Sequence, residues 1–388
     1  MSWFDAALLV LIGLYAYTGW VNGFVSNFFS GMGLVLGFVL GIVVAPLVFG
    51  ERSGGPATGL MALALVFAVA GVGNLIGLRI GHALRIRQGP GRTVDAVAGA
   101  AFGTAVVMAV SWAVGYAVST STLPYISTVV RESVVLARVD SVMPTRAGDL
   151  LRSFTDTLTT DVFPQYLDPF QAEVIPSTQS PDESVLRRRG VRAARDSVVT
   201  VRGEAECRRT VEGSGFVIAA DRVMTNAHVV AGVSAPIVTL GDRRLRATTV
   251  VFDEDLDLAV LAVPGMNGRP LRFDTRAEEG DPAAVLGFPE NGPFDARAAR
   301  IRARIDLRGP DIRGRGRVAR DVFSIRALVR SGNSGGPLVS EDGDVVGVIF
   351  AASISDEETG YAVTAAEAFP VAREGIRAAD AVGTGACT

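Results

Sequence analysis

The most informative stretch of the chain reads Ser331-Gly332-Asn333-Ser334-Gly335-Gly336-Pro337-Leu338. Glycines on both sides of Ser334 let the backbone turn tightly and expose its N–H groups. Two further unusual strings precede it along the chain, Thr225-Asn226-Ala227-His228-Val229-Val230 and Asp253-Glu254-Asp255-Leu256-Asp257-Leu258. The sequence therefore presents a histidine, an aspartate and a serine in that order, each in a distinctive local context.

These three residue types suit acyl-transfer chemistry. A serine hydroxyl is a weak nucleophile at neutral pH unless a neutral imidazole accepts its proton, and a buried carboxylate then orients that imidazole. We predict Ser334 as the nucleophile, His228 as the general base and acid, and Asp257 as the orienting residue. His228 is the only histidine outside the apolar N-terminal region, which makes it the natural acid–base group of this part of the chain.

Other interpretations of these residues exist. Asp253 and Asp255 compete for the third role, and Asp257 is preferred because it directly precedes the apolar run 258–261. A glycine-rich serine loop is commonly only a turn, and a histidine can be a satisfied structural residue. The joint occurrence of all three motifs, in order, favours catalysis.

Short apolar runs separated by Gly and Asp begin near residue 190 and predict a many-stranded β domain. The clearest runs are 197–201, 215–218, 236–240, 258–263, 283–286 and 345–350. The His–Asp–Ser order and the strings around His228 and Ser334 resemble the trypsin-like serine proteases, especially their bacterial envelope members. This resemblance implies an all-β chymotrypsin-like double β-barrel, with the amides of Gly332 and Ser334 as the oxyanion hole.

The chain also departs from parts of that family. Asn333 stands where pancreatic-type enzymes have an aspartate that captures a freed N-terminus, so activation by N-terminal insertion is not expected. The residues after Ser334 suffice for closing strands and a helix near 365–378, but not for a PDZ domain. The base of the specificity pocket falls near Leu328, so we expect a preference for a medium apolar side chain rather than arginine.

The N-terminal part is typical of an all-α membrane domain. Mean hydropathy of the chain is +0.35, and no charged residue occurs between Asp5 and Glu51, a stretch more than twice the ~20 residues that span a bilayer. We expect it to fold back at Asn22-Gly23. Four transmembrane helices are predicted, near 3–21, 24–49, 58–78 and 96–118, with no buried charge inside them. A cleavable signal peptide fits poorly because no basic residue precedes the first span.

Arginines predict the orientation of this domain. The loop between the third and fourth spans carries Arg79, Arg85, Arg87 and Arg92. The positive-inside rule places that loop in the cytoplasm, so that four spans leave both chain ends outside. We therefore expect a multi-pass protein of the inner (plasma) membrane with a periplasmic protease domain. The first part of the chain resembles the colicin V production (CvpA-type) membrane domain.

Small residues recur in the spans. Gly33, Gly37 and Gly41 repeat at four-residue spacing. Such spacing serves either a dimer interface or pore, or close helix packing inside one bundle, and we favour the bundle.

The middle of the chain predicts a linker. Pro164, Pro169, Pro176 and Pro181 disfavour both helix and sheet. We divide the chain into a transmembrane domain at 1–122, amphipathic helices and a proline-rich linker at 123–188, and the protease domain at 189–388. Self-cleavage in the linker is a further expectation, although most such linkers are only linkers.

Composition excludes several other functions. Lysine is absent, so all 37 basic residues are arginines, which rules out a Walker A lysine or a Ser–Lys dyad. The net charge of −3 argues against nucleic-acid binding. Two cysteines and two histidines make a metal site unexpected, and we expect no cofactor. Cys207 and Cys387 would pair in an oxidising compartment, and two unpaired thiols are the alternative.

Taken as a whole, the chain resembles the actinobacterial membrane-anchored acid-resistance periplasmic serine proteases, the MarP family. The resemblance implies a membrane-tethered serine endopeptidase that cleaves envelope proteins during acid or oxidative stress. Two alternatives remain at this level. The β domain could be a catalytically silent envelope scaffold, or the helices could form a channel or transporter.

Overall fold

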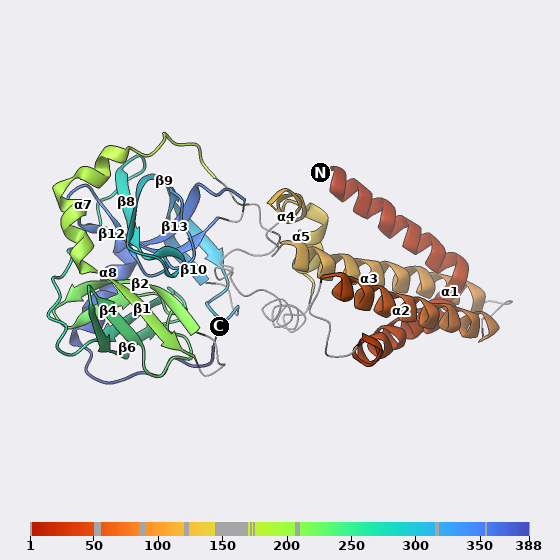
Figure 1. The fold of residues 1–388 in the computed structure, drawn as a ribbon. Helices are drawn as coiled ribbons and strands as arrows, with labels where there is room; N and C mark the ends of the chain where they lie inside the picture. The colour runs from red at the N-terminus through yellow and green to blue at the C-terminus, as the bar shows by residue number, and fades with distance from the viewer. Residues whose placement is uncertain are drawn as a thin grey trace. The chain divides into compact units, whose positions relative to one another are not determined.

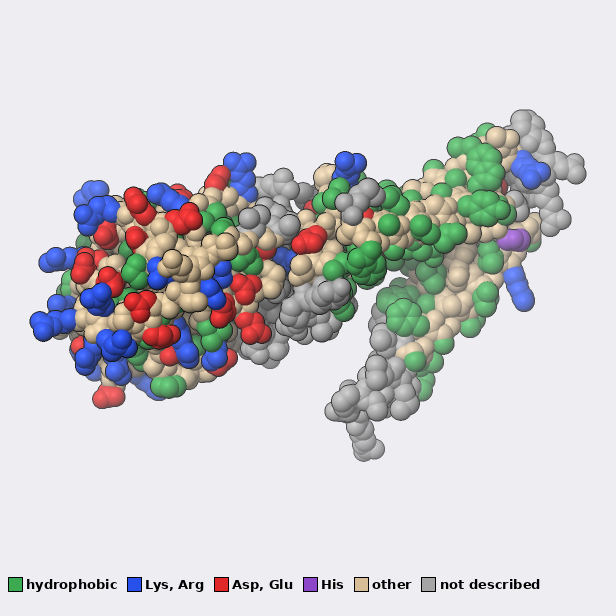
Figure 2. Space-filling model, turned by 90° about the horizontal axis from the view of Figure 1, so that it is seen from above, with side chains coloured by type: hydrophobic (Ala, Val, Ile, Leu, Met, Phe, Trp, Pro, Cys, Tyr) green, Lys and Arg blue, Asp and Glu red, His purple; other side chains and the backbone are tan. Residues whose placement is uncertain are grey.

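The computed structural model describes residues 2–49, 56–84, 91–119, 124–143, 170, 173, 175–205, 210–314, 318–353 and 355–387 (Figure 1). The chain divides into two compact units. One comprises Met1–Tyr116 with Glu132–Met143, and the other Ala117–Arg131 with Pro144–Thr388. Hydrophobic side chains cover the helices, whereas charges of both signs are spread over the β-rich part (Figure 2).

The N-terminal helices are α1 (Trp3–Phe49), α2 (Pro56–Leu84) and α3 (Gly91–Ser119), followed by the short α4 (Pro124–Arg131) and α5 (Val134–Asp140). Three helices of the described residues are long and apolar enough to cross a membrane. The sequence predicts four spans, and the difference lies in α1, whose 47 residues include both of the first two.

Helix α1 is broken at Gly23, where φ is +76° and the backbone is not helical. This is the position predicted for the turn. The half before the break packs on α3, since a Cβ on Gly19 would lie 2.3 Å from the carbonyl oxygen of Gly99. The half after it packs on α2, since a Cβ on Gly33 would lie 2.1 Å from the oxygen of Gly73. The small residues therefore serve close packing inside one bundle, as predicted.

The expectation that the spans hold no buried charge was wrong. Asp5, inside the first predicted span, is buried, and so is Asp95 in α3, one residue before the fourth predicted span. Asp95 accepts a hydrogen bond from the amide of Val25 at 3.1 Å, directly after the break in α1. Asp5 accepts from the hydroxyl of Ser133 at 2.7 Å. Both carboxylates satisfy donors at helix ends, a role that the search for uncharged stretches could not reveal.

The first β-sheet has seven strands in the order β5-β4-β1-β2-β3-β7-β6, all antiparallel. Its strands are β1 (Val198–Glu204), β2 (Thr210–Ala219), β3 (Arg222–Thr225), β4 (Ile237–Leu240), β5 (Arg243–Arg246), β6 (Thr248–Asp253) and β7 (Leu258–Ala262). Valines are common in these strands, and with Ala259, Leu261 and Met266 they form a buried core.

The second sheet closes into a barrel in the order β10-β13-β12-β11-β8-β9. Its strands are β8 (Pro282–Gly287), β9 (Asp295–Gly309), β10 (Val318–Arg326), β11 (Pro337–Val339), β12 (Val345–Ala352) and β13 (Thr359–Thr364). Short 3₁₀ turns η1 (Glu183–Arg187), η2 (Arg195–Ser197) and η3 (Pro289–Asn291) and helix α7 (Arg189–Ala194) complete this part. The two sheets match the predicted chymotrypsin-like architecture.

Helix α8 (Ala365–Arg377) follows the last strand, where the sequence predicts a terminal helix. The hydroxyl of Thr364 caps it by accepting from the amide of Glu367. It packs against the first sheet, because a Cβ on Gly375 would lie 2.5 Å from Val260. Arg222 fixes this contact by donating to the carbonyl of Gly375 at 2.9 Å. The end of the second sheet is thereby attached to the first.

The predicted linker is only partly described: Pro164 and Pro169 lie outside the described residues. Residues 175–182 have no helix or strand, as the prolines predict. At the end of the predicted linker, Arg188 pairs with Glu341 at 2.9 Å on the surface.

Candidate active site

Strand pairing brings His228 and Asp257 together. His228 follows β3, Asp257 precedes β7, and these two strands are neighbours in the first sheet. The imidazole Nδ1 lies 2.7 Å from Oδ2 of Asp257, and the backbone amide of His228 donates to Oδ1 of the same carboxylate at 2.9 Å. Asp257 is fully buried, whereas the side chain of His228 is 11% exposed. The carboxylate therefore fixes the orientation of the imidazole ring through Nδ1.

The backbone at Asp257 is unusual. Its φ is +57°, a left-handed conformation that non-glycine residues rarely adopt. The side-chain amide of Asn226 donates to the carbonyl of Asp257 at 2.7 Å and helps to hold this conformation. Of the two competing aspartates, Asp253 accepts from the amides of Asp255 and Leu256, so it stabilises its own turn instead. The geometry thus favours Asp257 for the third role.

The loop that carries Ser334 belongs to the barrel formed by the second sheet and abuts the segment around His228. The carbonyl of Ser334 accepts from the amide of Ser214 at 2.8 Å. A Cβ on Gly335, whose φ is +81°, would lie 2.3 Å from the hydroxyl of Thr225. Gly213 lies between Val229 and Ser334, with a Cβ there only 2.7 Å from the valine and 3.0 Å from the serine carbonyl. Ser334 therefore lies beside residues 225–229, which include His228.

The backbone amides of Gly332 and Ser334 are the predicted donors of an oxyanion hole. Gly332 is buried with φ +90°. The carbonyl of Ser331 accepts from the amide of Glu290 at 2.7 Å, and the amide of Asn333 donates to Arg330 at 3.0 Å. No described residue accepts a hydrogen bond from the amides of Gly332 or Ser334. These two N–H groups can therefore serve a bound oxygen.

Leu328 and Val329 precede this loop in the sequence. Leu328 is half-buried, while the next residue, Val329, is buried. A Cβ placed on Gly360 of β13 would lie 2.4 Å from Val329, so the valine occupies the space that the glycine leaves open.

Several polar residues that support the site were not anticipated. Ser214 is fully buried; its hydroxyl donates to the carbonyl of Gly332 at 2.6 Å and accepts from the amide of Phe288 at 2.9 Å. Arg320, also fully buried, donates to the carbonyls of Asp255 and Pro310. Both residues reach positions that are far apart in the sequence. Ser214 stands in the string Gly213-Ser214-Gly215, but its role at Gly332 was not predicted, and Arg320 stands in no recognisable motif.

The C-terminal segment also reaches this region. Arg313 donates to Glu254 at 2.8 Å and to the carbonyl of Thr384 at 2.8 Å. Cys387 is disulfide-bonded and lies against Gly232, four residues after His228. Its predicted partner, Cys207, lies outside the described residues, so the pairing of Cys207 with Cys387 stays a prediction.

Comparisons with known proteins assign the two parts of the chain. A trypsin-like peptidase domain model matches residues 213–348, and a colicin V production protein model matches residues 4–144. The chain is 40% identical over 393 residues to the serine protease Rv3671c of Mycobacterium tuberculosis, covering 100% of this chain and 98% of that protein. The crystal structure of the active form of the Rv3671c protease matches with a TM-score of 0.54 and 46% identity, covering 57% of this chain and 98% of that one. A probable DegP-like periplasmic serine endoprotease of Halomonas elongata is 36% identical over 154 residues, 38% of this chain and 30% of that protein.

Fold and comparisons together define a serine protease of the trypsin-like class with apolar helices suited to a membrane. Because the likeness to Rv3671c extends along the full chain, the protein belongs to the MarP family of serine proteases, in which a CvpA-like domain precedes the peptidase domain.

Proposed function

We propose that this membrane serine protease is an endopeptidase of the cell envelope that works through Ser334, His228 and Asp257. The contact between His228 and the buried carboxylate of Asp257 carries the proposal, since it fixes the ring beside the Ser334 loop. A catalytically silent scaffold would not need a buried carboxylate hydrogen-bonded to His228. Peptide and protein chains are accordingly the substrates, with no cofactor in the reaction.

The geometry supports an acyl-enzyme mechanism. The hydroxyl oxygen of Ser334 attacks the peptide carbonyl carbon while Nε2 of His228 accepts its proton. As the C–N bond breaks, the imidazolium passes that proton to the leaving amine. Water then attacks the ester, again with His228 as base, and releases the acid and free Ser334. Asp257 stays ionised throughout and stabilises the imidazolium.

The oxyanion of each tetrahedral intermediate needs hydrogen-bond donors. We assign this role to the amides of Gly332 and Ser334, because no described residue accepts from them. Preorganised donors of this kind stabilise the developing negative charge without reorganising during the reaction.

The envelope location rests on two supports. A disulfide at Cys387 suits an oxidising compartment. The arginines of the loop between α2 and α3 favour the cytoplasmic side for that loop. We therefore place the protease domain in the periplasm, with several membrane passes before it. An alkaline phosphatase fused after Thr388 should be active in intact cells, and activity of a cytosol-restricted reporter there instead would contradict this topology.

A fluorophosphonate probe tests the catalytic proposal. The full chain in detergent should be labelled, and labelling should disappear in Ser334→Ala and in His228→Ala. Unchanged labelling of Ser334→Ala would overturn the assignment. A proteomic comparison of envelope fractions from cells with active and Ser334→Ala protein, in acid and under oxidants, would identify substrates and test the stress role. New N-termini before Glu173 in the active protein alone would support self-cleavage.

A further inference from the structure

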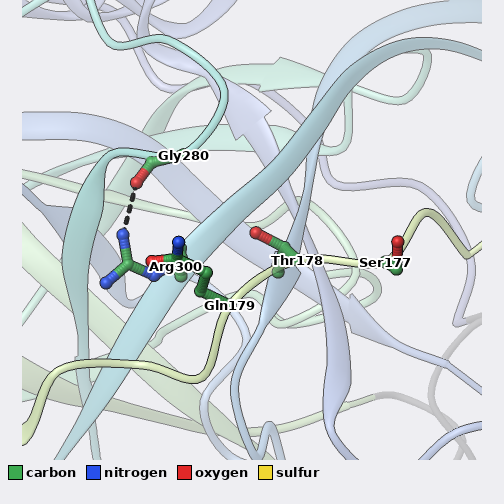
Figure 3. A pocket seen from close by; sticks show the side chains of 5 residues that line it. All are labelled: Ser177, Thr178, Gln179, Gly280 and Arg300. Carbon is green, nitrogen blue, oxygen red and sulfur yellow. Dashed lines mark hydrogen bonds between the residues drawn. The ribbon is translucent and has the colours of Figure 1, made fainter.

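Arginines bind the segment just before the peptidase domain to the barrel formed by the second sheet. We call residues 175–180 the strap. The carbonyls of Pro176, Thr178 and Ser180 accept, in turn, from Arg302 at 2.9 Å, Arg326 at 3.1 Å and Arg300 at 3.2 Å. Figure 3 shows part of the strap beside Arg300, whose guanidinium also donates to the carbonyl of Gly280 at 2.6 Å. Alternate carbonyls of one extended segment are thus fixed by two adjacent strands.

Two of these arginines also bind the loop between β12 and β13. Arg302 is buried and donates to the carboxylate of Asp356 at 3.2 Å. Arg326 donates to the carboxylate of Glu358 at 2.9 Å. Each guanidinium therefore joins a strap carbonyl to a loop carboxylate, so the strap and the loop are positioned together.

Glu173, two residues before the strap, accepts several hydrogen bonds through its one carboxylate. Its carboxylate accepts from the hydroxyls of Ser353 at 2.7 Å and Tyr361 at 2.5 Å, and from the hydroxyl and amide of Ser355. Tyr361 is only 4% exposed. Burial and the negative charge of Glu173 raise the pKa of Tyr361 above its ordinary value, so its hydroxyl remains a donor to the carboxylate. One side chain thus satisfies four donors at the base of the β12–β13 loop.

That loop in turn supports the segment leading to Ser334. The carbonyl of Glu358 accepts from the amide of Ala327 at 2.9 Å. Val329 fills the space over Gly360, at the end of the same loop. Leu328, the predicted base of the specificity pocket, lies between these two anchor points. Displacement of the loop would therefore move the predicted base of the pocket while leaving His228 and Asp257 in place.

We propose that Glu173 is a positioning residue for substrate binding, which acts through the β12–β13 loop on the specificity pocket beside Leu328. This inference rests on the proposed protease function. The trypsin-like peptidase domain model matches only residues 213–348. If Glu173 acts in this way, those residues alone do not define the substrate site. Without the carboxylate, the donors of Ser353, Ser355 and Tyr361 lose their common acceptor in a buried setting, and the loop must shift to find others.

Steady-state kinetics with the full chain in detergent tests the proposal. Cleavage is measured with a panel of peptides that differ in the side chain before the cleaved bond. The rate of fluorophosphonate labelling is measured beside it, because a small probe makes few contacts with the specificity pocket. Glu173→Gln should lower kcat/KM for the best peptide at least tenfold, mainly through KM, and change the order of preference within the panel. Its labelling rate should stay within about twofold of the unsubstituted chain. Glu173→Asp, which keeps the charge, should recover part of the loss.

Two further variants keep the test decisive. Glu341→Gln removes an exposed carboxylate that binds Arg188 on the surface and should leave both readouts unchanged. Tyr361→Phe removes one donor without adding a competing group and should shift KM in the same direction as Glu173→Gln. An unaltered KM and preference in both Glu173→Gln and Tyr361→Phe would overturn the proposal. So would parallel losses of labelling and cleavage in both variants, which indicate general misfolding. An unlabelled unsubstituted chain would instead contradict the proposed function itself.

Discussion

Replacement of Asp257 by asparagine gives the sharpest test of the site, because the structure dictates how the amide must lie. The backbone amide of His228 donates to Oδ1 at 2.9 Å, so the amide oxygen of an asparagine would take that place. Its NH₂ group would then face Nδ1 of the imidazole, where Oδ2 now lies at 2.7 Å. Two donors cannot face each other, so the ring would carry its proton on Nε2 instead. An Nε2–H cannot accept the proton of Ser334.

We therefore expect Asp257→Asn to lower kcat by about 10⁴-fold, equivalent to about 5 kcal/mol of transition-state stabilisation. Peptide hydrolysis gives the number, and thermal unfolding checks that the variant is folded. Asp255→Asn is the matched control and should keep near-normal kcat, because the hydrogen bonds of Asp255 to described residues involve its backbone. The reasoning fails if Asp257→Asn retains more than about a tenth of the activity, or if Asp255→Asn loses as much.

Two other expectations follow from single contacts. A Cβ on Gly332 would lie 2.5 Å from the carbonyl of Phe288 at a φ of +90°, so Gly332→Ala should displace the oxyanion donor and lower kcat by about 10²–10³-fold; unchanged kcat would exclude this amide from the site. The hydrogen bond from Arg304 holds the pKa of Asp321 below its ordinary 3.8. The pair therefore stabilises the fold above pH 3.8, and this stabilisation is lost as the pH falls through the pKa that Asp321 has in the folded protein. Because the pair is partly exposed, Asp321→Asn should lower the free energy of unfolding by less than about 1 kcal/mol at pH 7. The difference in melting temperature between the variant and the unsubstituted chain should shrink near pH 3. A difference that persists in acid would contradict this assignment.

The parts of the protein that sequence predicts well are those in which neighbours along the chain form the structure. The apolar runs became strands, and the helix break lies at Gly23, because a glycine can adopt φ +76° without steric cost. His228 and Asp257 could be paired in advance because each stands next to a strand, and adjacent strands bring their ends together. The family pattern around Ser334 carries the same kind of local information.

Contacts made by single polar side chains over long separations escaped prediction. Glu173 binds groups about 180 positions away in the chain, and Asp95 supports a helix end 70 positions away. Neither residue belongs to a repeated spacing or a motif, so nothing local distinguishes it from a solvated carboxylate. Only the folded chain shows that each has donors around it that would otherwise be unsatisfied.

Two other long-range contacts, made by Ser214 and Arg320, explain how a site shared by two β-sheets keeps its geometry. His228 and Asp257 come from the first sheet and Ser334 from the second, so a small slip between the sheets would separate them. Ser214 reaches from the first sheet to the carbonyl of Gly332, and Arg320 reaches from the second sheet to the carbonyl of Asp255. One contact thus holds the serine loop and the other holds the aspartate loop, each from the opposite side. Because both residues are fully buried, breaking either contact leaves an unsatisfied polar group in the interior, which penalises any slip between the sheets.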